Sequence, residues 1–212
     1  MSPAIFIRKA HEYDDVYSYW FRHPTLRYEG GRYVHLQIGA LWSGGAVREL
    51  SFASAPHEEE LMFTVHIGSG SRYKRRLHTL RPGDRVRAFL VGGNVVLPKR
   101  PTGKPLVFIA GGVGMAPFRS LILEAHRRGG FDLRVIQVQR GDFLYRHELE
   151  PLVAEYAGVR PEELIGHVRA QAAATPEALF YTCGSRRLIT TVRDELTAAG
   201  VDKRSILIEN FG

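Results

Sequence analysis

A glycine-rich stretch in the second half of the sequence has the residue types that bind phosphate. This stretch, Ala110–Pro117, directly follows an apolar run and precedes a segment of helical spacing. Glycines let the backbone turn sharply and let a phosphate approach closely, and Pro117 suits the first turn of a helix. Free amides and the helix dipole favour an anion there. We therefore predict a nucleotide site. A plain tight turn is the alternative, because Pro117 stands where the G-x-G-x-x-G fingerprint has its third glycine.

A second candidate phosphate site lies in the first half, at Gly68-Ser69-Gly70-Ser71. Ser71 is a natural helix N-cap, and Lys74 would lie close to an anion bound at this helix start. A capped surface helix would have the same residues, so this stretch is open to both interpretations. If both sites bind, two phosphorylated ligands are expected to meet at one crevice.

The single cysteine, Cys183, ends an apolar segment that we predict to be a strand. Parallel sheets bind ligands outside the carboxyl ends of their strands, so Cys183 is expected to face the crevice. The alternative is a small buried hydrophobic residue. One thiol forms no internal disulfide and cannot hold an iron–sulfur cluster, which needs about four cysteines. A reducing cytoplasm is the natural setting for such a chain.

The sequence lacks the motifs of several other enzyme classes. The nine histidines show no H-E-x-x-H or other metal spacing, so no metal site is predicted. The sequence has no G-x-S-x-G nucleophile elbow and no G-x-x-x-x-G-K-[S/T] phosphate loop. These absences argue against a serine hydrolase and against a nucleotide hydrolase of the phosphate-loop type.

Composition restricts the possible partners. The 212 residues carry a formal net charge of +7, but the cations are spread along the chain without a base-reading motif, so nucleic acid is not expected. No apolar run approaches about 18 residues, which argues against membrane insertion. The N-terminus has no cationic stretch followed by an apolar block, so a secretory signal is not expected and the predicted location is cytoplasmic.

Short strands and turns fill the first hundred residues, a pattern typical of an antiparallel barrel. One strand shows it clearly: Leu61, Phe63 and Val65 alternate with Met62 and Thr64, as in a half-buried strand. A short helix is predicted over Tyr73–Leu80. The predicted strands are Ile5–Ala10, Val16–Phe21, Tyr33–Ile38, Arg48–Ala53, Leu61–Ile67 and Arg85–Val91.

After a proline- and glycine-rich linker, strands and helices alternate, which predicts a parallel sheet covered on both faces. We expect two domains, an antiparallel β-barrel domain at 1–98 and an α/β nucleotide-binding domain at 104–212. The predicted strands are Leu106–Ala110, Leu133–Val138, Gly166–Arg169, Leu179–Cys183 and Ser205–Glu209. The predicted helices are Pro117–Arg128, Arg146–Tyr156 and one that ends near Ala199.

Taken in order, these motifs resemble the ferredoxin–NADP reductase superfamily along nearly the whole chain, in its single-chain form without an iron–sulfur domain. Each quoted segment is similar to a short motif of that family. The segments are Gly31-Arg32-Tyr33-Val34, Arg48-Glu49-Leu50-Ser51-Phe52-Ala53-Ser54, Ser71-Arg72-Tyr73-Lys74, Pro82-Gly83-Asp84-Arg85-Val86, Gly111-Gly112-Val113-Gly114-Met115-Ala116-Pro117, Gly166-His167-Val168, Thr182-Cys183-Gly184-Ser185 and Glu209-Asn210-Phe211-Gly212.

The resemblance implies a flavin oxidoreductase that uses FAD, with FMN as a further option, and NADPH or NADH. It implies that the barrel at 1–98 is of Greek-key type and is the flavin-binding domain. Implied catalytic residues are Ser51, Cys183 and Glu209. Implied flavin ligands are Arg48, Leu50, Ser51, Ser54, His66, Gly70, Ser71, Lys74 and Phe211. Implied nicotinamide ligands are Gly112, Gly114, Met115, Pro117, Arg140 and Gly184. The implied partner is an acidic electron carrier such as ferredoxin or flavodoxin, a haem protein or an oxygenase component.

Departures from the family pattern keep other functions open. Leu50 replaces the usual tyrosine, which leaves a reductase of free flavin as an alternative, and a non-catalytic nucleotide-sensing subunit is another. Leu90-Val91 stands where many relatives have Gly-Pro. No acidic residue ends the strand Leu133–Val138, so a 2′-phosphate of NADPH is acceptable there. Candidate partners for that phosphate are Arg140, Arg146, Arg186 and Arg187.

Overall fold

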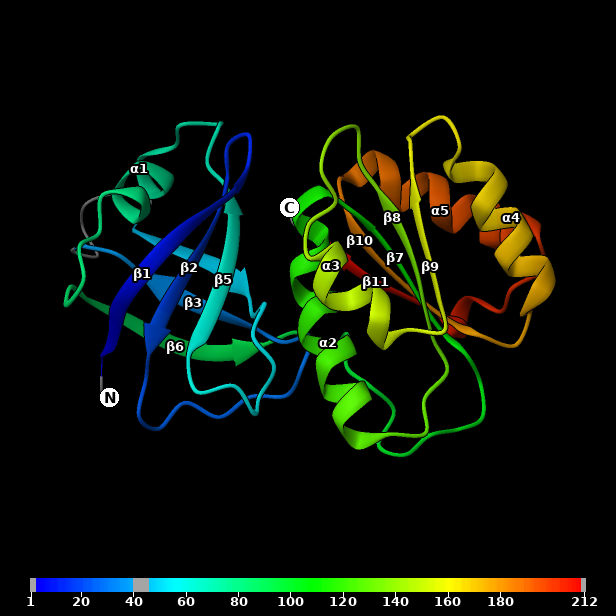
Figure 1. The fold of residues 1–212 in the computed structure, drawn as a ribbon, viewed down its shortest axis with the longest axis horizontal. Helices are drawn as coiled ribbons and strands as arrows, with labels where there is room; N and C mark the ends of the chain where they lie inside the picture. The colour runs from blue at the N-terminus through cyan, green and yellow to red at the C-terminus, as the bar shows by residue number, and fades with distance from the viewer. Residues whose placement is uncertain (1–2, 40–45, 211–212) are drawn as a thin grey trace.

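The computed structural model describes residues 3–39 and 46–210 and shows two units side by side (Figure 1). The first is a six-stranded antiparallel, barrel-like sheet with the order β4-β3-β6-β1-β2-β5. Its strands are β1 (Ala4–Tyr13), β2 (Val16–Arg22), β3 (Tyr33–Gln37), β4 (Val47–Ser51), β5 (Leu61–His66) and β6 (Arg85–Gly92), and its helix is α1 (Arg72–His78). The predicted fold of this half is therefore confirmed.

Aromatic side chains fill the barrel. Phe6 meets Phe21 at 5.3 Å between ring centroids, and Phe21 meets Phe63 at 5.8 Å. Strand β5 differs from the expected half-buried pattern, because Leu61 to Val65 are all buried. Its second face packs against the other unit: Met62 lies in a cluster with Ala116. Amphipathic spacing could not anticipate burial by a neighbouring domain.

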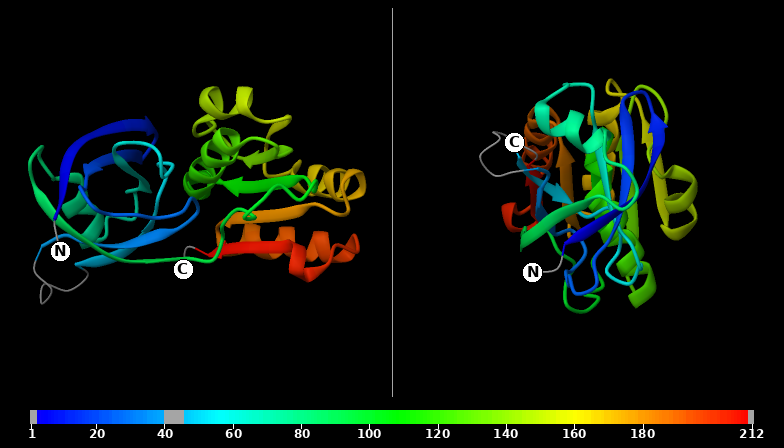
Figure 2. Two further views of the ribbon diagram at one scale, coloured as in Figure 1. Left: turned by 90° about the horizontal axis from the view of Figure 1, so that it is seen from below. Right: turned by 90° about the vertical axis from the view of Figure 1, so that its left-hand side faces the viewer.

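The second unit is a five-stranded parallel sheet with the order β11-β10-β7-β8-β9. Helices α2 and α3 cover one face and α4 and α5 the other (Figure 2). Its strands are β7 (Leu106–Gly111), β8 (Leu133–Val138), β9 (Glu155–Val159), β10 (Leu179–Gly184) and β11 (Ile206–Asn210), and its α-helices are α2 (Met115–Arg128), α3 (Arg146–Leu149), α4 (Leu164–Ala174) and α5 (Arg186–Ala198). Short 3₁₀ turns occupy Gly112–Gly114, Glu150–Leu152 and Lys203–Ser205. The predicted α/β fold of this half is also confirmed.

Two predicted elements of this half are wrong. The predicted helix Arg146–Tyr156 stops after α3 and a 3₁₀ turn that contains Pro151, and the chain then forms β9 against β8. Proline disfavours continuation of a helix because it lacks an amide hydrogen. The predicted strand Gly166–Arg169 lies inside helix α4, so Gly166-His167-Val168 does not occupy a strand.

The connection between the two sheets packs with the second unit. Val95 and Leu97 are buried in the hydrophobic core that contains Leu106 and Phe108. The Tyr181 hydroxyl donates a 3.1 Å hydrogen bond to the carbonyl of Val96. The domain limits at 98 and 104 stay a prediction.

A buried arginine joins the two units. Arg119 on α2 is 7% exposed, and its Nη1 donates to the carbonyl of Ala53 at 2.8 Å. Its guanidinium also donates to both carboxylate oxygens of Glu58 in the barrel unit and to both of Glu148 on α3. Burial alone would lower the pKa of Arg119, but the hydrogen bonds to Glu58 and Glu148 outweigh burial and raise that pKa. The guanidinium thus stays charged in the domain interface.

Further hydrogen bonds join the two units. Ser120 Oγ donates to the carbonyl of Ser54 at 2.6 Å. The amide of Gly30 donates to Glu124 at 2.8 Å. The Tyr145 hydroxyl is hydrogen-bonded to Thr64 Oγ1 of β5, which is in turn 2.6 Å from Ser18 Oγ. The relative placement of the two units therefore rests on several directional contacts.

Replacing the buried arginine should destabilise the protein. Arg119→Ala leaves Glu58 and Glu148 without their shared cation, so we expect the free energy of unfolding in urea to fall by about 2 kcal/mol. Arg146→Ala is the matched control, because Arg146 pairs with Glu150 on the surface, and surface pairs contribute little. Equal stability of the two variants would contradict the role given to Arg119.

Candidate functional site

Three adjoining cavities form one groove between the barrel and the parallel sheet. We call them the cradle (about 360 Å³), the loop cavity (about 420 Å³) and the outer cavity (about 630 Å³). The cradle shares His66 and Val113 with the loop cavity, and Arg48 and Ser51 with the outer cavity. The two phosphate sites predicted from the sequence therefore open into one continuous space.

The cradle brings two cations together. It is lined by Arg48, Glu49, Leu50, Ser51, Thr64, Val65, His66, Ser69, Ser71, Tyr73, Lys74, Val113 and Ala116. Burial and the charge of Arg48 lower the pKa of Lys74. Ser71 caps helix α1, its side chain accepting from the amide of Lys74. A cavity with two neighbouring cations and serine hydroxyls suits a phosphate, whose charge offsets their mutual repulsion.

Two buried hydroxyls in the cradle have no hydrogen-bond partner among the described residues. Ser51 is 7% exposed and Tyr73 1% exposed, and neither Ser51 Oγ nor the Tyr73 hydroxyl is satisfied. Buried polar atoms in proteins are nearly always hydrogen-bonded. The donor set of the cradle therefore fits a ligand that brings a phosphate and further polar atoms, as a flavin nucleotide does. Half-buried Leu50 adds an apolar contact beside them.

The loop cavity lies at the carboxyl ends of β7 and β10. These strands are neighbours, and the sheet extends from them in opposite directions, which is the point where such sheets bind ligands. Its lining residues are Tyr13, Asp14, Val16, His66, Gly111, Gly112, Val113, Gly114, Gln139, Gly184 and Ser185. A Cβ on Gly114 would stand 2.6 Å from the carbonyl oxygen of Cys183, so glycine is required there. Gly112 has φ +55°, a conformation that also favours glycine.

Several predicted cofactor ligands do not line the groove. Ser54 is 1% exposed, and its hydroxyl is hydrogen-bonded to Tyr28 and to the amide of Met62. Met115 and Pro117 are buried in the first turn of α2, where Met115 packs in the core. Gly70 and exposed Arg140 are absent from the linings of the three cavities. Ser54 thus fixes the interface rather than meeting the groove, while the ligand roles of the others stay predictions.

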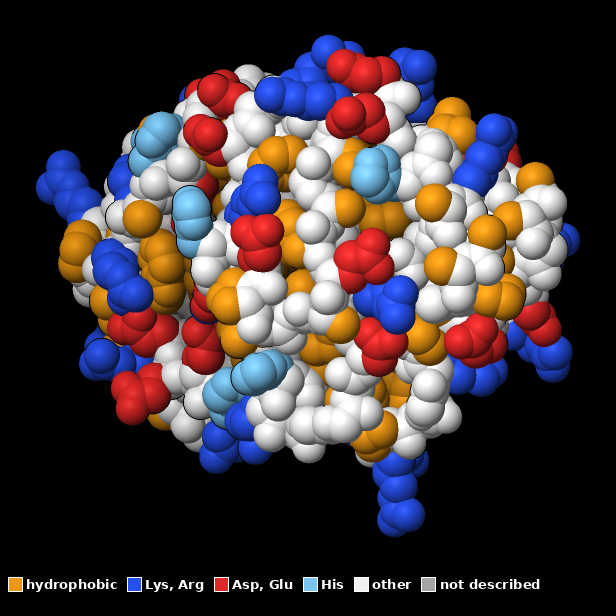
Figure 3. All heavy atoms as spheres, turned by 45° about the vertical axis from the view of Figure 1, so that its right-hand side comes forward, with side chains coloured by type: hydrophobic (Ala, Val, Ile, Leu, Met, Phe, Trp, Pro, Cys, Tyr) orange, Lys and Arg blue, Asp and Glu red, His pale blue; other side chains and the backbone are white. Residues whose placement is uncertain are grey.

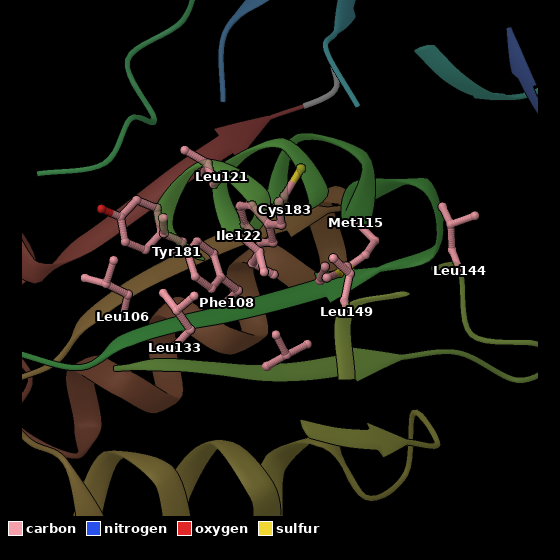
Figure 4. Close-up of a cluster of buried hydrophobic side chains, with 14 of the residues drawn as sticks. Leu106, Phe108, Met115, Leu121, Ile122, Leu133, Leu144, Leu149, Tyr181 and Cys183 are labelled. Atoms are coloured by element: carbon pink, nitrogen blue, oxygen red, sulfur yellow. The ribbon is translucent and has the colours of Figure 1, made fainter. Parts of the chain in front are cut away.

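Cys183 is enclosed, contrary to the expectation that it faces the crevice. Its side chain is 0% exposed and belongs to the hydrophobic cluster with Met115 and Phe118 (Figure 4). The β7–α2 turn packs directly over its backbone, at Gly114. Burial, with the charge of Glu209, raises the pKa of the Cys183 thiol. Its predicted place beside a nicotinamide ring is untested, and reaching it requires the covering residues to move.

Glu209 lines the outer cavity. It pairs in register with Cys183 across β10 and β11, and it is 9% exposed. Burial, together with the charge of Glu49, raises the pKa of Glu209 to about 7. The other lining residues are Tyr33, His35, Val47, Arg48, Glu49, Ser51, Gly93, Asn94 and Ile208. The predicted ligand Phe211 lies outside the described residues.

Sequence reasoning missed groove residues that come from the partner half of the fold. Tyr13 and Asp14 belong to the β1–β2 hairpin of the barrel yet line the loop cavity, where the Tyr13 side chain is hydrogen-bonded to Gln139. Gln139 directly follows β8, and the carboxyl-end rule that selected Cys183 would also have found it. Nothing in the local sequence of the hairpin indicates its contact with another domain.

The described residues offer no other obvious chemistry. Within 3–39 and 46–210, no group of His, Cys, Asp and Glu could hold a metal ion. None of the helices described is long and apolar enough to cross a membrane. The face drawn in Figure 3 mixes basic and acidic side chains, without a continuous basic surface.

Comparison with known proteins places the chain in a class. No protein-family profile matches it. Ferredoxin–NADP reductase B of Sorangium cellulosum is 29% identical, over 87% of this chain and 85% of that protein. The flavohemoprotein of Pseudomonas aeruginosa is 26% identical over 97% of this chain, which spans 57% of that protein. The solved structure of a ferredoxin NADP⁺ reductase from Neisseria gonorrhoeae with bound FAD and NADP has a TM-score of 0.80 at 22% identity, over 99% of this chain and 98% of that one.

In sequence and in its two-unit fold the chain resembles the NAD(P)H-dependent flavoprotein reductases. Both the sequence matches and the shared architecture extend over most of the chain. The chain is therefore similar, over nearly its whole length, to members of the ferredoxin–NADP reductase superfamily.

Removing the cradle arginine should weaken flavin binding. We expect Arg48→Ala to raise the flavin dissociation constant about tenfold to a hundredfold, since a hydrogen bond to a charged group contributes about 1.5–3 kcal/mol. Fluorescence titration of the flavin-free protein with FAD measures this. Arg87→Ala on β6 is the matched control, because Arg87 is exposed and absent from the cradle. Unchanged affinity in Arg48→Ala would remove Arg48 from the site.

The raised pKa of Glu209 predicts how stability depends on pH. Because folding raises that pKa from 4.5 to about 7, the folded state binds more protons than the unfolded state in this range, and stability falls as pH rises through it. Glu209→Gln should flatten this slope and raise the free energy of unfolding above pH 7 by on the order of 2 kcal/mol. Glu59→Gln, at an exposed site, should preserve the slope. If the stability of Glu209→Gln depends on pH as steeply as that of the wild type, the raised pKa of Glu209 does not cause the slope.

Proposed function

We propose that the protein is an FAD-containing oxidoreductase that takes hydride from NAD(P)H and passes electrons to a separate carrier. The observation that carries this proposal is the continuity of the groove, in which the cradle and the loop cavity meet at His66 and Val113. Two ligands bound in these cavities would lie in contact. Holding two reactants in contact removes much of the entropic barrier to transfer.

The cradle is the proposed flavin site. Arg48, Lys74 and Ser71 would hold the flavin phosphates, and the unpartnered Ser51 hydroxyl would bond the ring. Leu50 would pack against the ring. The flavin supplies the redox chemistry, and the side chains of the cradle bind it, orient it and exclude water.

The loop cavity is the proposed nicotinamide site. Gly112, Gly114 and Gly184 would admit the dinucleotide phosphates to the backbone at the start of α2. We favour NADPH over NADH because Gln139 rather than an acidic residue follows β8. Arg146 is engaged with Glu150, so Arg140 and the exposed pair Arg186 and Arg187 are better candidates for a 2′-phosphate.

The proposed electron acceptor is an external protein, such as a ferredoxin, a flavodoxin, a haem protein or an oxygenase component. With one cysteine, the chain cannot bind an iron–sulfur cluster of its own. Its net charge of +7 favours encounter with an acidic carrier. The single cysteine is also consistent with the reducing cytoplasm that we propose as its location.

Leu50 supports a second candidate, a reductase that uses free flavin as substrate. An aromatic ring in that position would stack on a flavin, whereas Leu50 makes only an aliphatic contact, so the flavin is expected to dissociate more readily. Flavin that is lost on dialysis, with turnover restored by riboflavin or FMN, would favour this alternative. Tight nucleotide binding without flavin reduction would instead favour a non-catalytic sensing subunit.

Anaerobic reduction tests the proposed function. Purified protein loaded with FAD should be yellow, and NADPH should bleach it faster than NADH does, as measured by stopped-flow absorbance. Cys183→Ala should slow this bleaching at least tenfold while nucleotide affinity changes little, if its thiol packs at the hydride site as predicted. The proposal fails if the wild-type protein neither takes up flavin nor oxidises either nucleotide.

A further inference from the structure

The barrel carries an apolar residue in an unfavourable backbone conformation at the edge of the groove. In the pairing of β3 with β6, Val34 faces Val91 and His35 faces Phe89, so Leu90 is the extra residue of a β-bulge. Leu90 has φ +50°, in the left-handed region. Bulges of this kind commonly place glycine there, because a Cβ is sterically unfavourable in that conformation.

Packing inside the described protein does not offset this strain. The Leu90 side chain is 67% exposed, and the neighbouring Val91 is 38% exposed. A leucine in a core would gain from burial, but this one presents its side chain to solvent. Strained residues that persist without a packing benefit are found at functional sites, which makes an observed outlier a ground for a functional hypothesis.

Hydrogen bonds fix the bulge against the wall of the outer cavity. The carbonyl oxygen of Leu90 lies 3.0 Å from His35 Nδ1, and His35 Nε2 lies 3.2 Å from Glu49 Oε1. The His35 ring stacks on Phe89 at 5.6 Å between ring centroids. Both His35 and Glu49 line the outer cavity, which the cradle joins at Ser51. Figure 1 shows that β6 runs toward the second unit, so the bulge lies at the end of the strand nearest the groove.

Basic side chains lie on the same strand. Arg87 pairs with Gln37 and Phe89 with His35, so Arg87 shares the outward face of β6 with Phe89, and Arg85 lies two residues further back. Both arginines are exposed. The exposed side chains of β6 therefore run from a basic stretch, Arg85 and Arg87, to an apolar projection, Leu90 and Val91, at the end of the strand nearest the outer cavity. A protein partner that fits this surface has an acidic surface with an apolar depression.

We propose that the Leu90 bulge is the apolar contact through which an acidic one-electron carrier protein docks at the mouth of the outer cavity. This proposal rests on the function proposed above. In the net reaction one NAD(P)H and two oxidised carriers give NAD(P)⁺, one proton and two reduced carriers. Apolar contacts near the centre of an interface contribute most of the affinity, while surrounding charges mainly speed encounter.

Leu90→Gly tests the contact without threatening the fold, because glycine adopts φ +50° readily. The probes are an acidic plant-type [2Fe–2S] ferredoxin and, as a small acceptor that needs no docking surface, ferricyanide. We expect Leu90→Gly to raise the Kd for the ferredoxin, measured by calorimetry, and its KM as acceptor by at least fivefold. Ferricyanide reduction by NADPH should stay within twofold of wild type. The slope of ferredoxin KM against salt should also be preserved, since no charge is removed.

Two controls complete the experiment. Ile165→Ala changes another exposed apolar residue, 38% exposed on α4, and should leave the ferredoxin Kd unchanged. Arg85→Ala with Arg87→Ala should raise the ferredoxin KM mainly at low salt. If the ferredoxin Kd is unchanged in Leu90→Gly, the proposed Leu90 contact is wrong. If the wild-type protein reduces ferricyanide but does not bind the ferredoxin, the proposal that the docking partner is an acidic carrier is wrong. Loss of ferricyanide reduction in the wild-type protein would instead refute the function on which this proposal rests.

Discussion

The groove depends on the interface between the two units, and the buried charge of Arg119 is the centre of that interface. Arg119 projects from the second unit and is enclosed by a carbonyl and a carboxylate of the barrel and by a carboxylate of α3. An arginine so deeply buried is tolerated only when its donors are satisfied, which holds both units to one relative orientation. Most of the cradle belongs to the barrel and most of the loop cavity to the second unit, so their junction depends on that orientation. Helix α2 therefore serves twice, since the turn that leads into it lines the loop cavity and its second turn carries the arginine.

The two sides of the groove use different physical means to suit anionic ligands. In the cradle, the cations Arg48 and Lys74 repel each other, and an anion such as phosphate would offset that repulsion. At the β7–α2 turn the backbone is decisive, because glycine there lets the turn contact β10. The outer cavity differs from both, because its lining mixes the carboxylates of Glu49 and Glu209 with Arg48 and His35.

Much of this could be predicted from sequence, and the failures have physical causes. Alternating strands, turn residues and the strand–glycine–helix order are local features, so the two folds followed from them, while the two phosphate sites stay predictions. The prediction of one helix after Arg146 was wrong because that run of residues forms a short helix and then an edge strand, with Pro151 between them. Ser54 and Cys183 were predicted to face a ligand, but each is enclosed by residues distant in sequence, Tyr28 and Met115 among them. Burial from long-range packing, as also on β5, leaves no local periodicity to detect.

The packing of Val95 and Leu97 into the second core has a consequence for motion and for engineering. A connection anchored in this way is no free hinge, so ligands are expected to enter an assembled cleft through side-chain and loop rearrangement rather than by swinging of whole domains. The same anchoring determines which residues must be transferred together when a domain is grafted between related reductases. A graft that takes the parallel sheet without residues 93–98 would open cavities in its core and lose the bond from Tyr181, whereas a cut placed just after β6 would transfer an intact module.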